Sequence, residues 1–177
     1  MKLNENEIVR DITLEDIPEI ELYVDQIITL LNQYTLDKEK YLTKAMINNY
    51  SKAKIIEKIK GRKYSKAHII IIAIINRLKQ TLTINEIKLL MDKVNLNILD
   101  KDEAYILAII EKIYQSYTDI FSQSYNDSEK LDDLLLNASK ENSRGEYLLI
   151  EALCLSALSQ SYQQKVKNSI STEIIHK

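Results

Sequence analysis

The chain has 177 residues, enough for one sizeable hydrophobic core or for a smaller core with a helical extension. It contains only two glycines and one proline, which argues against a turn-rich sandwich or barrel and favours a mainly helical protein. The net charge is −2, and the single cysteine, Cys154, excludes an internal disulfide and suits a reducing cytoplasm.

The N-terminal part of the chain predicts two helices. The first 20 residues contain no uninterrupted apolar run, so they do not predict a signal peptide. Pro18 is expected in the first turn of a helix whose apolar face extends from Ile20 to Leu31 at helical spacing. Thr43 is a suitable N-cap for a second, short helix with the sequence KAMINNYSK.

A small hairpin is expected after the second helix. Ile55–Ile56 and Lys63–Tyr64 have the composition of two short strands, with the hairpin tip at residues 57–62. Gly61 would supply a positive φ if the turn requires one.

Two further helices are expected after the hairpin. Ser65 is positioned to cap KAHIIIIAIINRLKQ, and TINE, Thr83 to Glu86, matches a capping box ahead of IKLLMDKV. The run Ile69–Ile75 is far too short to cross a bilayer and predicts a buried helix. The resulting element order is that of a winged helix-turn-helix, and we expect a cytoplasmic protein without a membrane partner.

The C-terminal part predicts a helical region. Asp100 is placed to cap a long helix whose apolar residues, from Ile106 to Ile120, follow the helical period. A short helix and a polar turn around Gly145 come next, and a final helix is expected from about Glu146 to about Ile170. The beginning of this final helix is apolar on nearly every side, which predicts that it is sandwiched between other helices.

These patterns predict an all-α, mainly helical fold with one small β-hairpin. We divide the chain into residues 1–97, a winged helix-turn-helix domain with an acidic N-terminal segment, and residues 98–177. The second part is expected to be a helical domain for dimerisation or effector binding.

Three segments, ELYVDQIITLL, LTKAMINNYSK and RKYSKAHIIIIAIINRLKQTLTINEIKLL, together resemble a bacterial family catalogued as domain of unknown function 1836. The resemblance covers roughly residues 17–92. More distantly, this part of the chain is similar to MerR-type regulators. The resemblance implies a MerR-like winged helix-turn-helix fold, with the hairpin as the wing, and a function in DNA binding and transcription regulation.

The resemblance assigns roles to individual residues. Tyr50 matches the tyrosine that ends the MerR-type recognition helix and contacts the DNA backbone. Arg62 and Lys63 match the basic positions of the wing, and Tyr64 matches the tyrosine that packs inward. Asn48 stands where MerR proteins commonly have arginine, so that phosphate contact is lost or replaced.

The wing also departs from the family pattern. Ala53 and Lys54 occupy the place of the glycine that usually precedes the first wing strand, and the wing prolines are absent. The resemblance therefore implies a more mobile wing than in those relatives.

The charge distribution agrees with a nucleic-acid contact. Met1–Asp37 has 2 basic and 9 acidic residues, Lys38–Gln80 has 12 basic and 2 acidic residues, and Thr81–Lys177 has 10 basic and 15 acidic residues. A basic block between acidic ones is the footprint of a DNA-binding surface, although such a run also occurs as ordinary solvated surface.

The expected DNA-binding site combines phosphate contacts and base contacts. Asn48 and Asn49 have carboxamides that suit a bidentate contact with adenine in the major groove, or they simply face water. Tyr50 would add a contact to the DNA backbone. Phosphates would be neutralised by the basic residues of this segment, namely Lys44, Lys52, Lys54, Lys58, Lys60, Arg62, Lys63 and Lys66.

No pattern in the sequence predicts catalysis, a cofactor or a metal site. The only histidines, His68 and His176, have no cysteine or carboxylate cluster at ligand spacing beside them. Two glycines cannot form a glycine-rich phosphate loop. We therefore do not expect an enzyme, and no small-molecule effector is identified.

The expected partner is double-stranded DNA, bound by a transcriptional regulator. The apolar face of the helix from about Asp100 would serve a homodimer, but packing against the final helix explains it equally well. The alternative function is a winged-helix module that binds proteins and not DNA, through an exposed apolar face of its C-terminal helices.

Overall fold

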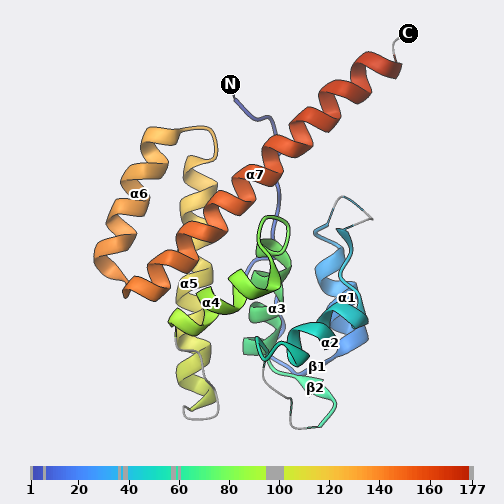
Figure 1. The fold of residues 1–177 in the computed structure, drawn as a ribbon, viewed down its shortest axis with the longest axis vertical. Coiled ribbons are helices and arrows are strands. Elements are labelled where there is room, and N and C mark those ends of the chain that lie inside the picture. Colours follow the sequence, from blue (N-terminus) through green and yellow to red (C-terminus); the bar gives the residue numbers. More distant parts are fainter. Residues whose placement is uncertain are drawn as a thin grey trace.

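The computed structural model describes residues 2–5, 7–35, 37, 40–56, 59, 61–94 and 102–175, without the side chains of the last four. These residues form seven helices and two short strands, which confirms the mainly helical class (Figure 1). The elements are β1 (Leu22–Tyr23), α1 (Val24–Asn32), α2 (Lys44–Lys52), β2 (Lys63–Tyr64), α3 (Lys66–Leu78), α4 (Ile84–Val94), α5 (Glu103–Ser124), α6 (Ser128–Glu141) and α7 (Arg144–Ile175).

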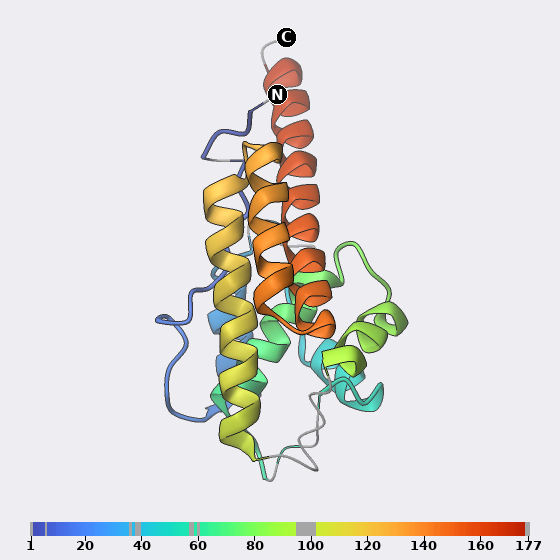
Figure 2. The same cartoon turned by 90° about the vertical axis from the view of Figure 1, so that its left-hand side faces the viewer.

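Helix α3 lies at the centre of the fold. All residues from Ile69 to Ile75 are buried, as expected for a helix that is apolar on every side. Helices α5, α6 and α7 contact one another and lie side by side in Figure 2, and α5 and α7 also contact α3. The buried side chains form one hydrophobic cluster that extends from Ile12 to Ala157. The DNA-binding part predicted from the sequence therefore shares its core with the C-terminal helices.

Helix starts follow the local capping signals. The Thr43 hydroxyl accepts a hydrogen bond from the Met46 N–H, which confirms the predicted N-cap of α2. Ahead of α4, the Thr83 N–H donates to the Glu86 carboxylate at 2.8 Å and the Glu86 N–H donates back to the Thr83 hydroxyl at 3.3 Å. This reciprocal pair confirms the capping box.

The start of α5 differs from its prediction. Asp102 is the N-cap, and its carboxylate accepts a hydrogen bond from the Ala104 N–H at 3.2 Å. The cap predicted at Asp100 lies outside the described residues. Both aspartates fit the sequence pattern, but the capping hydrogen bond determines which of them precedes the first helical turn.

The prediction that Pro18 begins the first helix is wrong. Leu22 and Tyr23 are extended, and α1 begins only at Val24. The reason is antiparallel pairing with β2, in which Leu22 lies opposite Tyr64 and Tyr23 opposite Lys63. This pairing between residues about 40 positions apart keeps the segment extended, and Ile20 is left 69% exposed.

The predicted hairpin is partly wrong. Lys63–Tyr64 is a strand and Gly61 has a φ of +105°, as expected. Ile55 and Ile56 are not a strand, because both are buried and donate their N–H groups to the Tyr50 carbonyl at the end of α2. The partner of β2 is therefore β1, which precedes α1 in the sequence.

Helix α7 is sandwiched at its beginning, as predicted. Leu149, Leu153, Cys154 and Ala157 have no exposed surface, and burial raises the pKa of the Cys154 thiol to about 12. The thiol therefore remains protonated and inert at neutral pH.

The turn before α7 was predicted around Gly145, but this residue lies in the first turn of the helix, which begins at Arg144. In the described part of the chain, no helix has the length and apolarity that a membrane crossing needs.

Gly145 lies where the first turn of α7 meets the C-terminal end of α4. A Cβ atom at this position would lie 2.2 Å from the Lys93 carbonyl oxygen, which is backbone and cannot move aside easily. We therefore predict that Gly145→Ala lowers the free energy of unfolding by about 1–3 kcal/mol. The measurement is urea denaturation of the wild type and the variant.

The sign of this effect is informative. In an unobstructed helix, replacing glycine by alanine adds about 1 kcal/mol of stability. A gain for Gly145→Ala would mean that α4 and α7 do not approach each other as described.

Candidate nucleic-acid interface

Helix α2 has one buried and one solvent-exposed face. Ile47 and Tyr50 face the core, whereas Lys44, Asn48 and Lys52 are exposed. These three exposed residues follow the i, i+4, i+8 spacing, so they form one row along the helix. Asn49, also exposed, lies in the next row.

The position of α2 is fixed by a side chain of α1. The Asn32 carboxamide donates to the Leu42 carbonyl at 3.0 Å and accepts from the Leu42 N–H at 2.8 Å. Leu42 itself is 1% exposed. This two-way contact ties the end of α1 to the residues just before α2.

The chain after α2 brings further cations to the same end of the molecule, where α2 and β2 lie close together in Figure 1. Arg62 and Lys63 are exposed, and the Lys63 ammonium lies 5.2 Å from the centroid of the Tyr23 ring on β1. We use the name α2–β2 surface for the exposed residues Lys44, Asn48, Asn49, Lys52, Lys54, Arg62 and Lys63.

Lys54 ends α2 in a conformation that suits glycine. Its φ is +57°, the left-handed region, and the carbonyls of Tyr50 and Ser51 accept hydrogen bonds from the residues that follow α2. The sequence resemblance predicts a departure from glycine at Ala53 and Lys54. The backbone therefore keeps the glycine-type turn although the side chain is a lysine.

Two predicted contact residues lie away from the α2–β2 surface. Tyr50 is 2% exposed, and burial raises the pKa of its hydroxyl to about 12. Lys66 is held between Glu111, at 2.8 Å, and Glu19, and the hydrogen bonds to these carboxylates raise its pKa. Lys58 and Lys60 were also predicted as contacts, and they lie outside the described residues.

One cation near the surface was not selected from the sequence. The Lys79 ammonium lies 3.5 Å from the Met46 sulfur in the first turn of α2, and burial lowers the pKa of Lys79. Helical spacing gave no signal for it, because Lys79 follows α3 and reaches α2 only through the tertiary fold.

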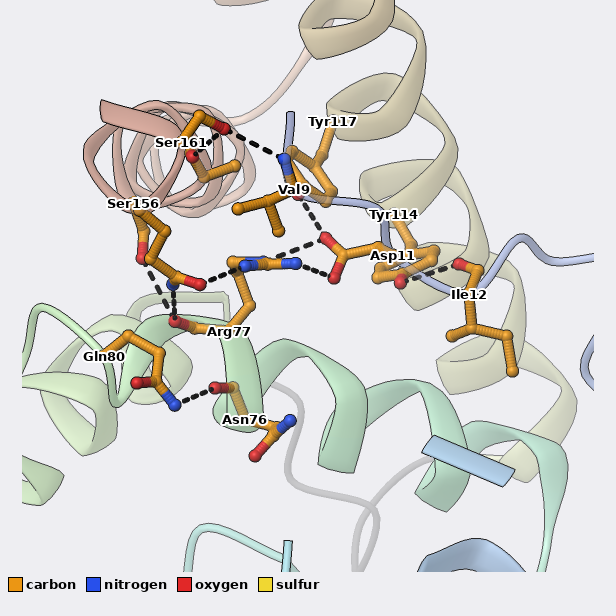
Figure 3. Close-up of polar contacts among 12 residues, drawn as sticks. Val9, Asp11, Ile12, Asn76, Arg77, Gln80, Tyr114, Tyr117, Ser156 and Ser161 are labelled. Carbon is orange, nitrogen blue, oxygen red and sulfur yellow. Dashed lines mark hydrogen bonds and ion pairs between the residues drawn. The ribbon is translucent and has the colours of Figure 1, made fainter. Parts of the chain in front are cut away.

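A buried polar cluster lies on the other side of α3 (Figure 3). The Arg77 guanidinium donates to both carboxylate oxygens of Asp11 and to the Gln160 side chain, and the Tyr117 hydroxyl also donates to Asp11. Burial alone would lower the pKa of Arg77, but the attraction of Asp11 raises it above its ordinary value. The cluster thus joins the N-terminal segment to α3, α5 and α7.

The same cluster borders a pocket between the N-terminal segment, the end of α1, α3 and α7. Four carboxamides line it, those of Asn76, Gln80, Gln160 and Gln164. Its lining also includes the carboxylates of Glu7, Asp11 and Asp37 and the hydroxyls of Tyr34 and Thr35. Elsewhere in the described residues, no group of histidine, cysteine and carboxylate side chains is placed to hold a metal ion.

Comparison with known proteins gives one match. The family model described as "Domain of unknown function (DUF1836)" matches residues 12–117, from the N-terminal segment to the middle of α5. No curated protein and no solved structure matches the chain.

The left-handed conformation of Lys54 generates a prediction. A residue with a Cβ atom pays roughly 1–2 kcal/mol of steric strain in this conformation, and glycine avoids most of that strain. Glycine loses more backbone entropy on folding, which offsets part of the gain. Lys54→Gly should therefore raise the free energy of unfolding by about 0.5–1 kcal/mol. The matched control is Asn49→Gly inside α2, which should lower stability. Equal losses in both variants would contradict the left-handed turn.

Proposed function

The chain belongs to the family described as a domain of unknown function (DUF1836), and we propose that it is a DNA-binding transcriptional regulator of the MerR-like winged-helix type. Helix α2 would be the recognition helix, and Arg62 and Lys63 would contact phosphates beside it. The observation that carries this proposal is the α2–β2 surface, which joins a short exposed helix to a second group of cations.

The dimensions of α2 suit the major groove. The helix has nine residues and is therefore about 14 Å long, with a diameter of about 10–12 Å including side chains. The major groove of B-DNA is about 12 Å wide and admits one helix. With Ile47 and Tyr50 turned inward, the row of Lys44, Asn48 and Lys52 is the face available to enter it.

The contacts would divide into two kinds. Lysine and arginine side chains of the α2–β2 surface would neutralise phosphates and release counterions, whereas Asn48 and Asn49 would read base edges. The acidic segments on either side of the basic block would repel DNA and so orient the α2–β2 surface toward it. In this proposal the protein has no enzymatic role.

The phosphate contacts are tested by salt dependence. We predict that Arg62→Ala with Lys63→Ala weakens binding to a duplex of mixed sequence and lowers the slope of log affinity against log salt by about two. Fluorescence anisotropy titrations at several salt concentrations measure this slope. The control is Lys130→Ala with Lys140→Ala on α6, which removes the same charge from exposed positions elsewhere. Equal slopes for the two double variants would contradict the proposed wing contact.

The base contacts are separated in the same assay. Asn48→Ala with Asn49→Ala should leave the affinity for mixed-sequence DNA unchanged, because base reading contributes little to non-specific binding. A uniform loss of affinity in this variant would count against base reading by the two asparagines.

A second candidate function is that of a protein-binding module without DNA. The observations in its favour are Asn48, which replaces the arginine of MerR proteins, and the exposed apolar side chains of the C-terminal helices, including Leu136 and Leu155. It predicts no DNA binding by the wild type even at low salt.

A further inference from the structure

The pocket beside the Arg77–Asp11 pair is lined by polar side chains of two helices. The lining residues of α3 follow the i, i+3, i+4, i+7 spacing and so share one side of that helix; they are Ala73, Asn76, Arg77 and Gln80. Gln160 and Gln164, four residues apart, line the pocket from α7. The N-terminal segment, the end of α1 and the residues after α1 close the other sides. Polar side chains that are distant in the sequence therefore converge on one space.

The charges that line this pocket leave two cations without a counter-ion. Each carboxylate of the lining already has a cation of the chain as its partner: Glu7 with Lys165 at 3.5 Å, Asp37 with Lys167 at 2.7 Å, and Asp11 with Arg77. Arg10 and Lys40 also line the pocket, and neither forms an ion pair within the described residues. The pocket therefore has an excess of positive charge, which suits a ligand with an anionic group.

The carboxamides of the pocket provide free acceptors. The Gln80 side-chain nitrogen donates to the Asn76 carbonyl at 3.5 Å (Figure 3), and the Gln164 side-chain nitrogen donates to the Asn168 side chain at 2.8 Å. The side-chain oxygens of Gln80 and Gln164 accept no hydrogen bond from the described residues. Since an amide oxygen can only accept, these two oxygens suit a ligand with N–H donors.

Asn76 adds an acceptor that is buried without a partner. Its Oδ1 atom has no hydrogen-bond partner among the described residues, although the side chain belongs to the lining of the pocket. In Figure 3 the carboxamide points away from the Arg77–Asp11 pair, so that pair does not satisfy it. Leaving a buried acceptor unpaired lowers stability. A donor bound in the pocket that Asn76 borders would recover this loss.

The size of the pocket limits the ligand. Its volume is about 80 Å³. One water molecule needs about 10–15 Å³ of such space, so the pocket suits a molecule of about five to eight non-hydrogen atoms. Small amino acids have this size, whereas nucleotides and sugars are larger.

From the charges, the acceptors and the volume together, we infer that this pocket binds a small α-amino acid in its zwitterionic form. The carboxylate pairs with Lys40 and Arg10, and the ammonium group donates to the amide oxygens of Asn76, Gln80 and Gln164. A carboxylate without an ammonium group would leave these oxygens unpaired, and an amine without a carboxylate would leave the two cations unpaired. The inference goes beyond the proposed DNA binding and is tested without DNA.

The test is isothermal titration calorimetry of the full chain at millimolar ligand. The probes are glycine, L-alanine, L-serine, L-threonine, L-proline and L-valine. Propionate and ethylamine are the matched controls, because each lacks one of the two charged groups of alanine. The tightest of the amino acids should bind saturably and at least tenfold more tightly than either control. No saturable binding of any of the six, or equal binding of a control, would overturn the inference.

Asn76→Leu separates ligand binding from folding. The substitution removes an acceptor that has no partner, so the free energy of unfolding of the ligand-free chain should be maintained or raised. The dissociation constant of the amino acid should rise at least tenfold. Asn32→Leu is the contrasting control for stability, because the Asn32 carboxamide bonds Leu42 in both directions and its loss should destabilise the chain. An unchanged dissociation constant in Asn76→Leu, or equal losses of stability in the two variants, would overturn the role of Asn76.

Lys40→Met tests the position of the carboxylate. It removes a cation of the pocket and keeps a side chain of similar length, so the dissociation constant of the amino acid should rise at least tenfold. Lys130→Met on α6 is the matched control, because it removes the same charge from an exposed position outside the pocket. Equal dissociation constants for the two variants would contradict the placement of the carboxylate at Lys40.

Discussion

The ion pair between Arg77 and Asp11 is the constraint on which the arrangement of this protein depends. Arg77 is 7% exposed, and its charge is acceptable in the core because Asp11 and Gln160 accept hydrogen bonds from its guanidinium. The Tyr117 hydroxyl in turn donates to Asp11. Removing one partner of such a buried pair typically costs about 3–5 kcal/mol. The pair fixes the N-terminal segment across α3, α5 and α7. That segment leads into β1, and β1 positions β2 beside α2. The ion pair on one side of α3 therefore helps to hold the α2–β2 surface in place through the N-terminal segment and β1.

Features determined by neighbouring residues could be predicted from the sequence. The bounds of α2, the Thr43 cap and the Thr83–Glu86 capping box depend on hydrogen bonds within a few residues, so composition and spacing are sufficient. The burial of Ile69–Ile75 followed from the absence of any polar residue in that run. The exposed row of Lys44, Asn48 and Lys52 on α2 could also be predicted, because helical periodicity alone places these residues on one side of the helix.

Features determined by distant residues could not be predicted in this way. The strand partner of Lys63–Tyr64 is Leu22–Tyr23, and no local signal distinguishes it from the nearer Ile55–Ile56. Arg77 reads as the polar end of an apolar run, yet it is buried because Asp11 and Gln160 reach it from distant parts of the chain. Lys66 belongs to the basic block by sequence, but Glu19 and Glu111 hold it away from the α2–β2 surface.

The central claim is that the α2–β2 surface binds DNA with sequence preference. The most direct measurement is selection of the wild-type chain against a randomised duplex pool at low and at physiological salt, followed by sequencing of the retained duplexes. We predict an enriched motif that persists at physiological salt, where non-specific phosphate contacts weaken. Retention of no DNA even at low salt would contradict the claim, and retention without an enriched motif would contradict base reading.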